Sequence, residues 1–327
     1  MRRREFITLV GGAAVWPLTV RAQQPATPVI GFLSGASPET MRELVAAFHR
    51  GLADTGFAEG RNLTIEYRWA EGNNDRLPVL AMDLVRRKVA VIATVGSTPA
   101  ALASKAATQT IPIVFFIGTD PVKVGLVASL ARPGGNVTGV TAIVVELLSK
   151  GLDLMHSLMP PGTKIAVIIN PANVPQSASE REVIQSAARA FGAPILTLNA
   201  TRPSELEPAF ETLISEKIGA LVVSGENFFL TQRDVMVALA ARHAVPTVYA
   251  AREFVLAGGL MSYGTRQADA VRQVGVNVGR ILKGENVADL PVQQVTQVQL
   301  AINLKTAKAL GLNIPNTLIG RADEVIE

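Results

Sequence analysis

Short apolar runs rich in valine and isoleucine alternate along this chain with longer segments of helical periodicity. In the first half, Ser37 and Pro38 fit the N-cap and first position of a helix whose Leu44, Phe48 and Leu52 share one face. The pattern there predicts strands at 29–33, 63–67, 89–95, 111–117 and 136–140, and helices from Ser37 and at 77–87, 99–108 and 121–130.

A second series of the same kind follows. It predicts helices at 146–158, 178–191, 204–217 and 231–243, each preceding a strand, at 164–169, 194–198, 220–224 and 246–249. Strands that alternate with helices predict parallel sheets with right-handed crossovers, and continuously apolar strands predict sheets covered on both faces. Two series of similar length favour an α/β chain of two doubly wound parallel-sheet lobes, with a single eight-unit barrel as the alternative.

The last quarter of the chain breaks this alternation. A strand at 260–264, a helix at 268–282 and a polar-alternating stretch at 292–300 do not continue it. Such segments are expected to cross back between two lobes, which argues against the barrel. Gly275 and Gly279 fall inside the predicted helix and are expected to permit close packing there.

The first 22 residues have the features of an export signal. Arginines at 2–4 precede a short apolar run at 8–20, with small residues at the −3 and −1 positions before Gln23. Adjacent arginines fit the twin-arginine type, with general secretion as the alternative. The run is shorter than the roughly 20 apolar residues of a membrane span, so the mature chain is expected to be free in the periplasm rather than membrane-inserted.

Composition excludes several classes of protein. The formal net charge is +4, but four arginines and one glutamate fall in the first 22 residues, which leaves the mature chain near +1. No basic block interleaved with aromatics is present, so nucleic-acid binding is not expected. The absence of cysteine excludes disulfides, thiolate chemistry and a lipid anchor at the cleavage site.

Groups of residues typical of catalysis are also missing. The three histidines, His49, His156 and His243, lie on separate predicted helices, without the spacing of a metal site. There is no Gly-x-Ser-x-Gly elbow, no phosphate loop and no dinucleotide fingerprint. We therefore expect a binding protein that needs neither cofactor nor metal. The alternative is an exported enzyme with Asp120 and Glu226 as its acid and base.

Ligands of open α/β sheets bind at the carboxyl ends of the strands. Small hydroxyl, amide and acidic residues follow the predicted strands here and lead into helix N-termini, which favour carboxylates. Thr98 and Asp120, which each precede a proline, also fit plain capping. The candidate site residues are Ser34, Gly35, Ala36, Gly96, Ser97, Thr98, Thr119, Asp120, Asn170, Asn173, Glu226, Asn227, Ser262 and Tyr263.

These loops contain two carboxylates but no arginine or lysine among the candidates. That suits a zwitterion whose carboxylate meets N–H and hydroxyl groups and whose ammonium meets Glu226 or Asp120. Phe228, Phe229 and Tyr263 could cover an apolar side chain, and Phe116 could do so too, although its place in mid-strand favours the core.

Several longer stretches carry a family resemblance: 119–122, 125–127, 131–140, 303–312 and 321–326. They resemble solute-binding proteins of ABC transporters, including the tryptophan/tyrosine-type binding proteins. The resemblance implies a type I periplasmic-binding-protein fold, with two lobes joined by three crossovers that close on a small molecule. We expect a monomer that delivers its ligand to the membrane permease of an ABC importer, with presentation of the ligand to a membrane sensor as the alternative.

The resemblance also implies a division of the chain. The N-terminal lobe is expected to hold residues 23–141 and 262–290, and the C-terminal lobe 142–261 and 291–327. Hinges are expected near Thr141, Ser262 and Pro291.

Overall fold

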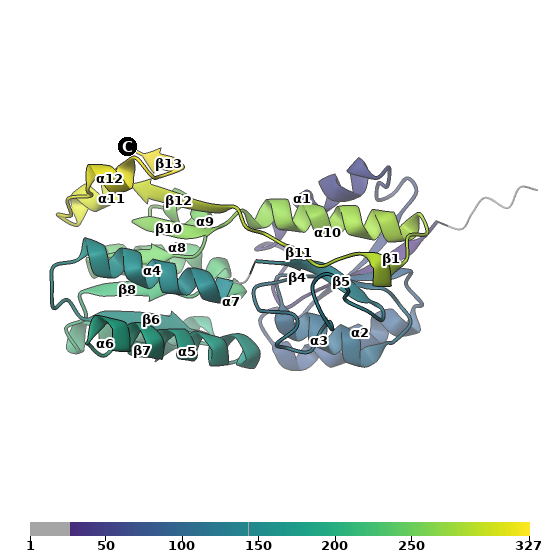
Figure 1. The fold of residues 1–327 in the computed structure, drawn as a ribbon, viewed down its shortest axis with the longest axis horizontal. Helices are drawn as coiled ribbons and strands as arrows, with labels where there is room; N and C mark the ends of the chain where they lie inside the picture. The colour runs from purple at the N-terminus through teal and green to yellow at the C-terminus, as the bar shows by residue number, and fades with distance from the viewer. Residues whose placement is uncertain (1–26, 143) are drawn as a thin grey trace, which may run out of the picture.

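The computed structural model describes residues 27–142 and 144–327, and the side chain of Val144 is not described. The expected signal at 1–22 and its cleavage site lie outside the described residues. The strands of the described part form two sheets, each with helices on both faces. Figure 1 shows the two lobes side by side, which confirms the predicted α/β architecture of two lobes.

The first lobe is built on an all-parallel sheet. Its register places Phe32 opposite Tyr67 on one side and Ala93 on the other. The strands, in spatial order, are β11 (Gln293–Gln294), β5 (Val137–Thr141), β4 (Ile113–Ile117), β3 (Val91–Val95), β1 (Val29–Ser34) and β2 (Thr64–Trp69).

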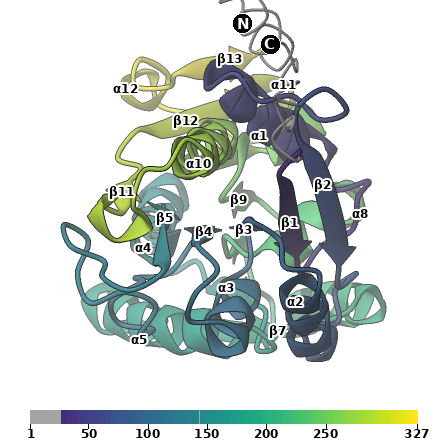
Figure 2. The same ribbon diagram turned by 90° about the vertical axis from the view of Figure 1, so that its right-hand side faces the viewer.

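Each face of this sheet is covered by two helices, because successive side chains of a strand point to opposite faces. Phe32 packs with α1 (Arg42–Asp54) and α10 (Gln267–Leu282), whereas Leu33 packs with α2 (Leu77–Arg86) and α3 (Thr98–Ala107). Figure 2 shows the two pairs of helices on opposite sides of the sheet.

The second lobe is built on a sheet in which β12 runs antiparallel to β10 and the other pairs are parallel. This antiparallel pair is where the last part of the chain joins the lobe. In spatial order the strands are β13 (Glu324–Ile326), β12 (Val298–Asn303), β10 (Met261–Thr265), β9 (Thr247–Tyr249), β8 (Ala220–Val223), β6 (Ile165–Ile169) and β7 (Leu196–Asn199).

Two apolar clusters cover the faces of the second sheet. Val167 faces one cluster and Ile168 the other, as the period of a strand requires. The helices of the first cluster are α4 (Val144–Leu158), α5 (Val174–Phe191), α11 (Leu304–Ala309) and α12 (Asn316–Ile319). Those of the second are α6 (Leu206–Ser215), α7 (Asn227–Thr231), α8 (Arg233–Arg242) and α9 (Arg252–Leu256).

The order of the elements requires the chain to pass between the lobes three times. It does so between β5 and α4, between β10 and α10, and between β11 and β12. Two boundaries fall later than the sequence-based division placed them, because β10 pairs within the second sheet and β11 pairs with β5 of the first. The second passage is thus near Arg266 rather than Ser262, and the third follows Gln294 rather than Pro291.

Two predicted helices differ from the structure. Residues 38–41 form a turn and α1 begins only at Arg42. Residues 121–130, predicted as a helix, form turns instead. Gly125 there has φ of 72°, outside the right-handed helical region, and the N–H groups of Leu126 and Val127 both return to the carbonyl of Pro121. Within the described residues, no helix is both long and apolar enough to cross a membrane.

Helices α1 and α10 pack through backbone as well as side chains. A Cβ built on Gly275 would lie 2.3 Å from the carbonyl oxygen of Phe48, and one on Gly51 would overlap the carbonyl of Arg272. A Cβ on Gly279 would overlap the side chain of Thr55. The close packing predicted for Gly275 and Gly279 is confirmed: each has room for hydrogen only.

Candidate functional site

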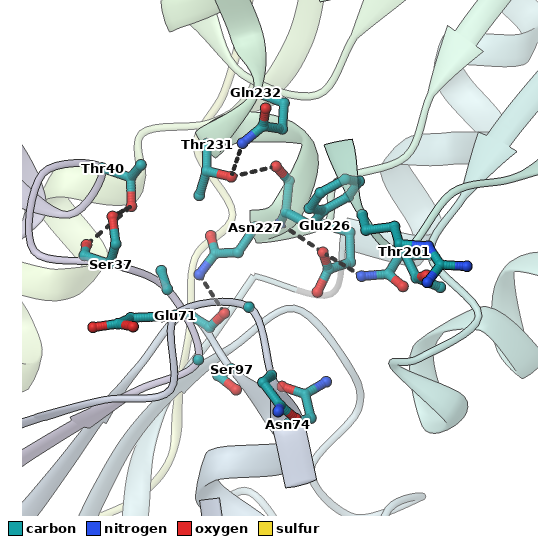
Figure 3. Close-up of a pocket in the computed structure, with 18 of the residues that line it drawn as sticks. Ser37, Thr40, Glu71, Asn74, Ser97, Thr201, Glu226, Asn227, Thr231 and Gln232 are labelled. Atoms are coloured by element: carbon teal, nitrogen blue, oxygen red, sulfur yellow. Dashed lines mark hydrogen bonds between the residues drawn. The ribbon is translucent and has the colours of Figure 1, made fainter. Parts of the chain in front are cut away.

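The carboxyl ends of β1, β2 and β3 in the first lobe face those of β6, β7 and β8 in the second. They enclose a cavity of about 350 Å³, which is within the range of small-molecule sites. Figure 3 shows Ser37, Glu71 and Ser97 on one wall and Glu226, Asn227 and Thr231 on the other. The predicted site residues that line this outer cavity are Gly35, Ala36, Gly96, Ser97, Asn170, Glu226 and Asn227.

The first-lobe wall includes the start of α3. The hydroxyl of Ser97 accepts a hydrogen bond from the backbone N–H of Ala100 at 3.2 Å and thereby caps the helix. Ser97, rather than Thr98, is the N-cap, and the hydroxyl of Thr98 pairs with that of Thr119 at 3.0 Å. Pro99 has no N–H and the N–H of Ala101 bonds to the carbonyl of Ser97, so the preference of this wall for negative charge comes mainly from the helix dipole.

The second-lobe wall centres on the carboxylate of Glu226. It accepts hydrogen bonds from the N–H of Phe228 at 2.6 Å and from the side-chain amides of Asn170 at 3.1 Å and Asn173 at 3.4 Å. Burial raises the pKa of Glu226, and these three hydrogen bonds, which stabilise the charged form, oppose the rise. The residue thus serves both as the N-cap of α7 and as a carboxylate that faces the cleft.

A smaller inner cavity lies behind the outer one, and Glu226, Gly96 and Asn227 line both. Its walls are mainly polar, and the predicted residues Thr98 and Asn173 lie there. Asn173 is 2% exposed, and its Oδ1 has no hydrogen-bond partner among the described residues; the same is true of Oε1 of Gln267. The remaining lining residues are Phe116, Gly118, Gln176 and Gly225.

The two walls meet at Gly96 and Asn227. The side-chain amide of Asn227 donates to the backbone carbonyl of Gly96. Gly96 has φ of 67°, and a Cβ built there would overlap the Asn227 amide. A glycine is therefore required at this position for two reasons: the backbone conformation and the contact across the cleft.

Five predicted residues lie outside the walls of both cavities. The hydroxyl of Ser34 donates to the carbonyl of Val95 and accepts from the N–H of Ala36, which fixes the loop after β1. Asp120 is exposed and caps a turn by accepting from the N–H groups of Val122 and Lys123.

The other three of these residues hold the lobes themselves in shape. Thr119 supports Thr98 through the pairing of their hydroxyls. Ser262 is 1% exposed within β10, where it lies opposite Tyr249 and Ala301. Tyr263, also in β10, packs against the cores of both lobes.

Two charged residues of the outer cavity escaped the sequence reasoning. Glu71 follows β2 and Arg202 follows β7, so the candidate loops do contain an arginine. Arg202 pairs with Glu205 at 2.7 Å and is largely exposed, whereas Glu71 pairs with Arg76 at 3.3 Å. The rule that ligands bind at the carboxyl ends of strands, which we call the strand-end rule, predicts both residues when it is applied to the half-buried strands β2 and β7.

Aromatic side chains near the cleft differ in their access to it. Phe228 is partly exposed and lines the outer cavity, as Pro99 and Pro203 do. Phe229 is fully buried in the core of the second lobe. Phe116 is 4% exposed, as expected of a core residue, yet it also lines the inner cavity. Phe228 is thus the aromatic ring that the cleft presents to a ligand in the outer cavity.

Known proteins resemble this chain in sequence and in structure. A tyrosine-binding protein of Clostridioides difficile is 29% identical over 265 residues, which cover 81% of this chain and 75% of that protein. The structure of an ABC domain in complex with L-Trp from Streptococcus pneumoniae is 26% identical, covers 92% of this chain and 100% of that one, and superposes with a TM-score of 0.81. The ligand-free, open structure of a substrate binding protein with adhesive properties from Clostridium difficile is also 26% identical, covers 91% and 99%, and gives a TM-score of 0.63.

The model of one protein family spans nearly all of the described residues. It matches residues 28–326 and is described as ABC transporter substrate binding protein. Together with the two-lobed α/β fold and the cavity between the lobes, this match shows that the chain belongs to the family of ABC transporter substrate-binding proteins.

Proposed function

We propose that this protein is a periplasmic receptor that captures a small zwitterion, an amino acid with an aromatic side chain, and delivers it to the membrane permease of an ABC importer. The observation that carries the ligand class is Glu226, a carboxylate in the cavity between the lobes, with the N-terminus of α3 on the facing wall. The first-lobe wall favours a negative group and the second-lobe wall favours a positive one, and both line the same cavity.

The zwitterion fits this polarity. Its carboxylate would meet the first turn of α3, near Ser97, where the helix dipole favours an anion. Its ammonium would meet the carboxylate of Glu226. The exposed Asp120, which caps a turn outside both cavities, is not required.

An aromatic side chain fits the outer cavity. Phe228 offers a ring there, Pro99 and Pro203 line the same cavity, and its volume of about 350 Å³ has space for a side chain beyond the head group. The tyrosine-binding relative and the L-Trp complex support the same class of ligand.

Closure of the lobes on the ligand is supported by the comparison of two relatives. At the same identity, the structure superposes better on the L-Trp complex, with a TM-score of 0.81, than on the open ligand-free structure, with 0.63. The bond between Asn227 and Gly96 is a contact that this closed arrangement makes across the cleft.

The periplasmic location rests on the export signal predicted at 1–22. N-terminal sequencing of the exported protein should give Gln23 as the first residue. Replacement of Arg3 and Arg4 by lysine should block export through the twin-arginine route. Unchanged export of that variant would indicate the general secretion route, and a chain that starts at Met1 in the membrane fraction would contradict the location.

The ligand class is tested by calorimetric titration with L-tyrosine and L-tryptophan. Glu226→Gln should weaken binding of both by at least about tenfold, because it removes the partner of a desolvated ammonium. The same change should matter little for 3-(4-hydroxyphenyl)propionate, which is tyrosine without its amine. Glu211→Gln, an exposed residue of α6, is the control. If Glu226→Gln bound both amino acids as tightly as wild type, the zwitterion assignment would be wrong.

A further inference from the structure

A continuous chain of buried side chains leads from Glu226 into the interior of the second lobe. Asn173 donates to Oε1 of Gln176 at 3.2 Å, and Gln176 donates to Oε1 of Glu180 at 2.9 Å. Asn173, Gln176 and Glu180 are 2%, 3% and 1% exposed. Glu180 is thus a second buried carboxyl, connected to Glu226 at the cleft through two amides.

The two carboxylates fix which way each amide points. An ionised carboxylate only accepts hydrogen bonds, so the amide groups next to it must present their NH₂ ends. Asn173 directs Nδ2 to Glu226 at 3.4 Å, and Gln176 directs Nε2 to Glu180. The carbonyl of Gln176 then accepts from Asn173, and the carbonyl of Asn173 is left facing away from the chain.

The inner cavity therefore presents acceptors. Oδ1 of Asn173 is unpaired among the described residues, as is Oε1 of Gln267 from the first lobe, and the carboxylate of Glu226 lines the same cavity. Buried acceptors without donors are costly, so they call for a ligand group that brings several N–H bonds. A protonated amine has three such bonds and the charge that a carboxylate prefers.

We propose that Glu180, through Gln176 and Asn173, is a positioning residue that makes the inner cavity selective for a protonated amine and that loses a proton when the amine binds. This inference rests on the proposed function, which it deepens by naming a residue, Glu180, that lines neither cavity. A neutral Glu180 could donate to Gln176 and would permit the opposite orientation of the amides, so only the ionised form enforces the arrangement.

The charges around Glu180 determine whether binding of the amine releases or takes up a proton. Burial raises the pKa of Glu180 to about 7, with a further rise from the negative charge of Glu226. Gln176, the hydroxyl of Ser224 and the guanidinium of Arg181 oppose the rise. An ammonium bound at Glu226 offsets that residue's charge and favours ionised Glu180, whose pKa falls in the complex. Binding therefore releases protons, and affinity rises with pH up to about 7 and levels off above it.

The first measurement is a calorimetric titration of L-tyrosine at pH 7 in two buffers of different ionisation enthalpy, which counts the protons released. Wild type should release a fraction of a proton, and Glu180→Gln should release clearly less. Glu211→Gln, which replaces an exposed glutamate of the same lobe, should match wild type. Equal proton release by wild type and Glu180→Gln would overturn the coupling, because a merely structural role would leave this count unchanged.

The second measurement is the ratio of the affinities for L-tyrosine and 3-(4-hydroxyphenyl)propionate. Glu180→Gln should lower this ratio about fivefold or more, because residues that share one hydrogen-bond network are energetically coupled by amounts of that size. Gln176→Leu, which breaks the chain but keeps Glu180, should lower it as well. An unchanged ratio in both folded variants would overturn the positioning role.

The wild-type titrations separate this inference from the proposed function. If wild type binds the amine-free acid as tightly as tyrosine, the selectivity is wrong while a solute receptor remains. If wild type binds neither compound, the aromatic amino-acid assignment is wrong and the inference falls with it. If wild type prefers tyrosine but the variants behave as wild type, only the inference fails.

Discussion

Asn227 of the second lobe hydrogen-bonds to the backbone carbonyl of Gly96 in the first lobe, at the border between the outer and inner cavities. The acceptor is main chain, so its position depends on the loop between β3 and α3 and not on a rotamer. The donor follows Glu226 directly, so the residue that we assign to the ligand's amine and the residue that joins the lobes are neighbours. Ligand capture and lobe contact are thereby brought to one place.

Gly96→Ala should weaken ligand binding by about tenfold or more. The alanine would have to keep φ near 67°, and its Cβ would overlap the Asn227 amide, so the lobes could not approach as closely. Gly162→Ala is the matched control, because Gly162 has φ of 83° but no neighbour within 4 Å of a built Cβ. Titration calorimetry should show weaker binding only for Gly96→Ala, and equal affinities would contradict the role of the contact.

Asn227→Ala should shift the unliganded protein towards open arrangements, because it removes this hydrogen bond between the lobes. Small-angle scattering should give a larger radius of gyration for the variant than for wild type without ligand. Saturating L-tyrosine should reduce the radius of gyration of both proteins. A curve that does not change on confirmed binding would contradict closure itself.

Glu180→Gln should stabilise the protein at pH 8 but not at pH 4.5. Burial raises the pKa of Glu180 to about 7, so its contribution to stability is present below the unfolded pKa near 4.5 and is lost as pH rises to 7. The loss amounts to at most about 3 kcal/mol, and glutamine avoids it. Urea unfolding at several pH values measures it, and Glu211→Gln should show no such pH-dependent gain. A pH-independent difference between Glu180→Gln and wild type would contradict the raised pKa.

Gly275→Ala should lower the free energy of unfolding by about 1–3 kcal/mol, because its Cβ would lie 2.3 Å from the carbonyl oxygen of Phe48 and force α1 and α10 apart. Gly151→Ala is the control on another helix, since its Cβ would have no neighbour closer than 3.4 Å. That control should be neutral or gain up to about 1 kcal/mol from helix propensity. Denaturant unfolding distinguishes the two, and equal effects would contradict backbone packing between the helices.

Much of the fold could be predicted from the alternation of apolar runs and helical segments, because each buried strand carries the signal locally. The segment at 121–130 shows where local reasoning fails. Its apolar spacing suits a helix, but Gly125 at positive φ ends any such helix, and Lys105 of α3 binds the carbonyls of Gly125 and Leu126. The hydrogen bonds from Lys105 come from a residue about 20 positions away in the sequence, so no local pattern within 121–130 reports them.

The site could be predicted in part for the same reason. The strand-end rule places Ser97, Asn170 and Glu226 in the cleft, because parallel strands bring their carboxyl ends to one edge of a sheet. It cannot distinguish a residue that faces the cleft from one that caps a turn, as Asp120 does. Glu180 gave no signal at all, since its burial depends on how α5 packs beneath Glu226 rather than on its neighbours in sequence.

Two of the passages between the lobes lie side by side. The N–H of Val295, just after β11, donates to the carbonyl of Thr141 at the end of β5, at 2.8 Å, so the first and third passages leave the first sheet as a bonded pair. Two segments held together by a hydrogen bond cannot slide past each other without breaking it. In the proposed closure, this pair would therefore restrict how the lobes move, so that Asn227 returns to Gly96 instead of to a different point on the opposite wall. A receptor of the proposed kind, which must present the same face to a permease in every cycle, would gain reproducible geometry from that restriction.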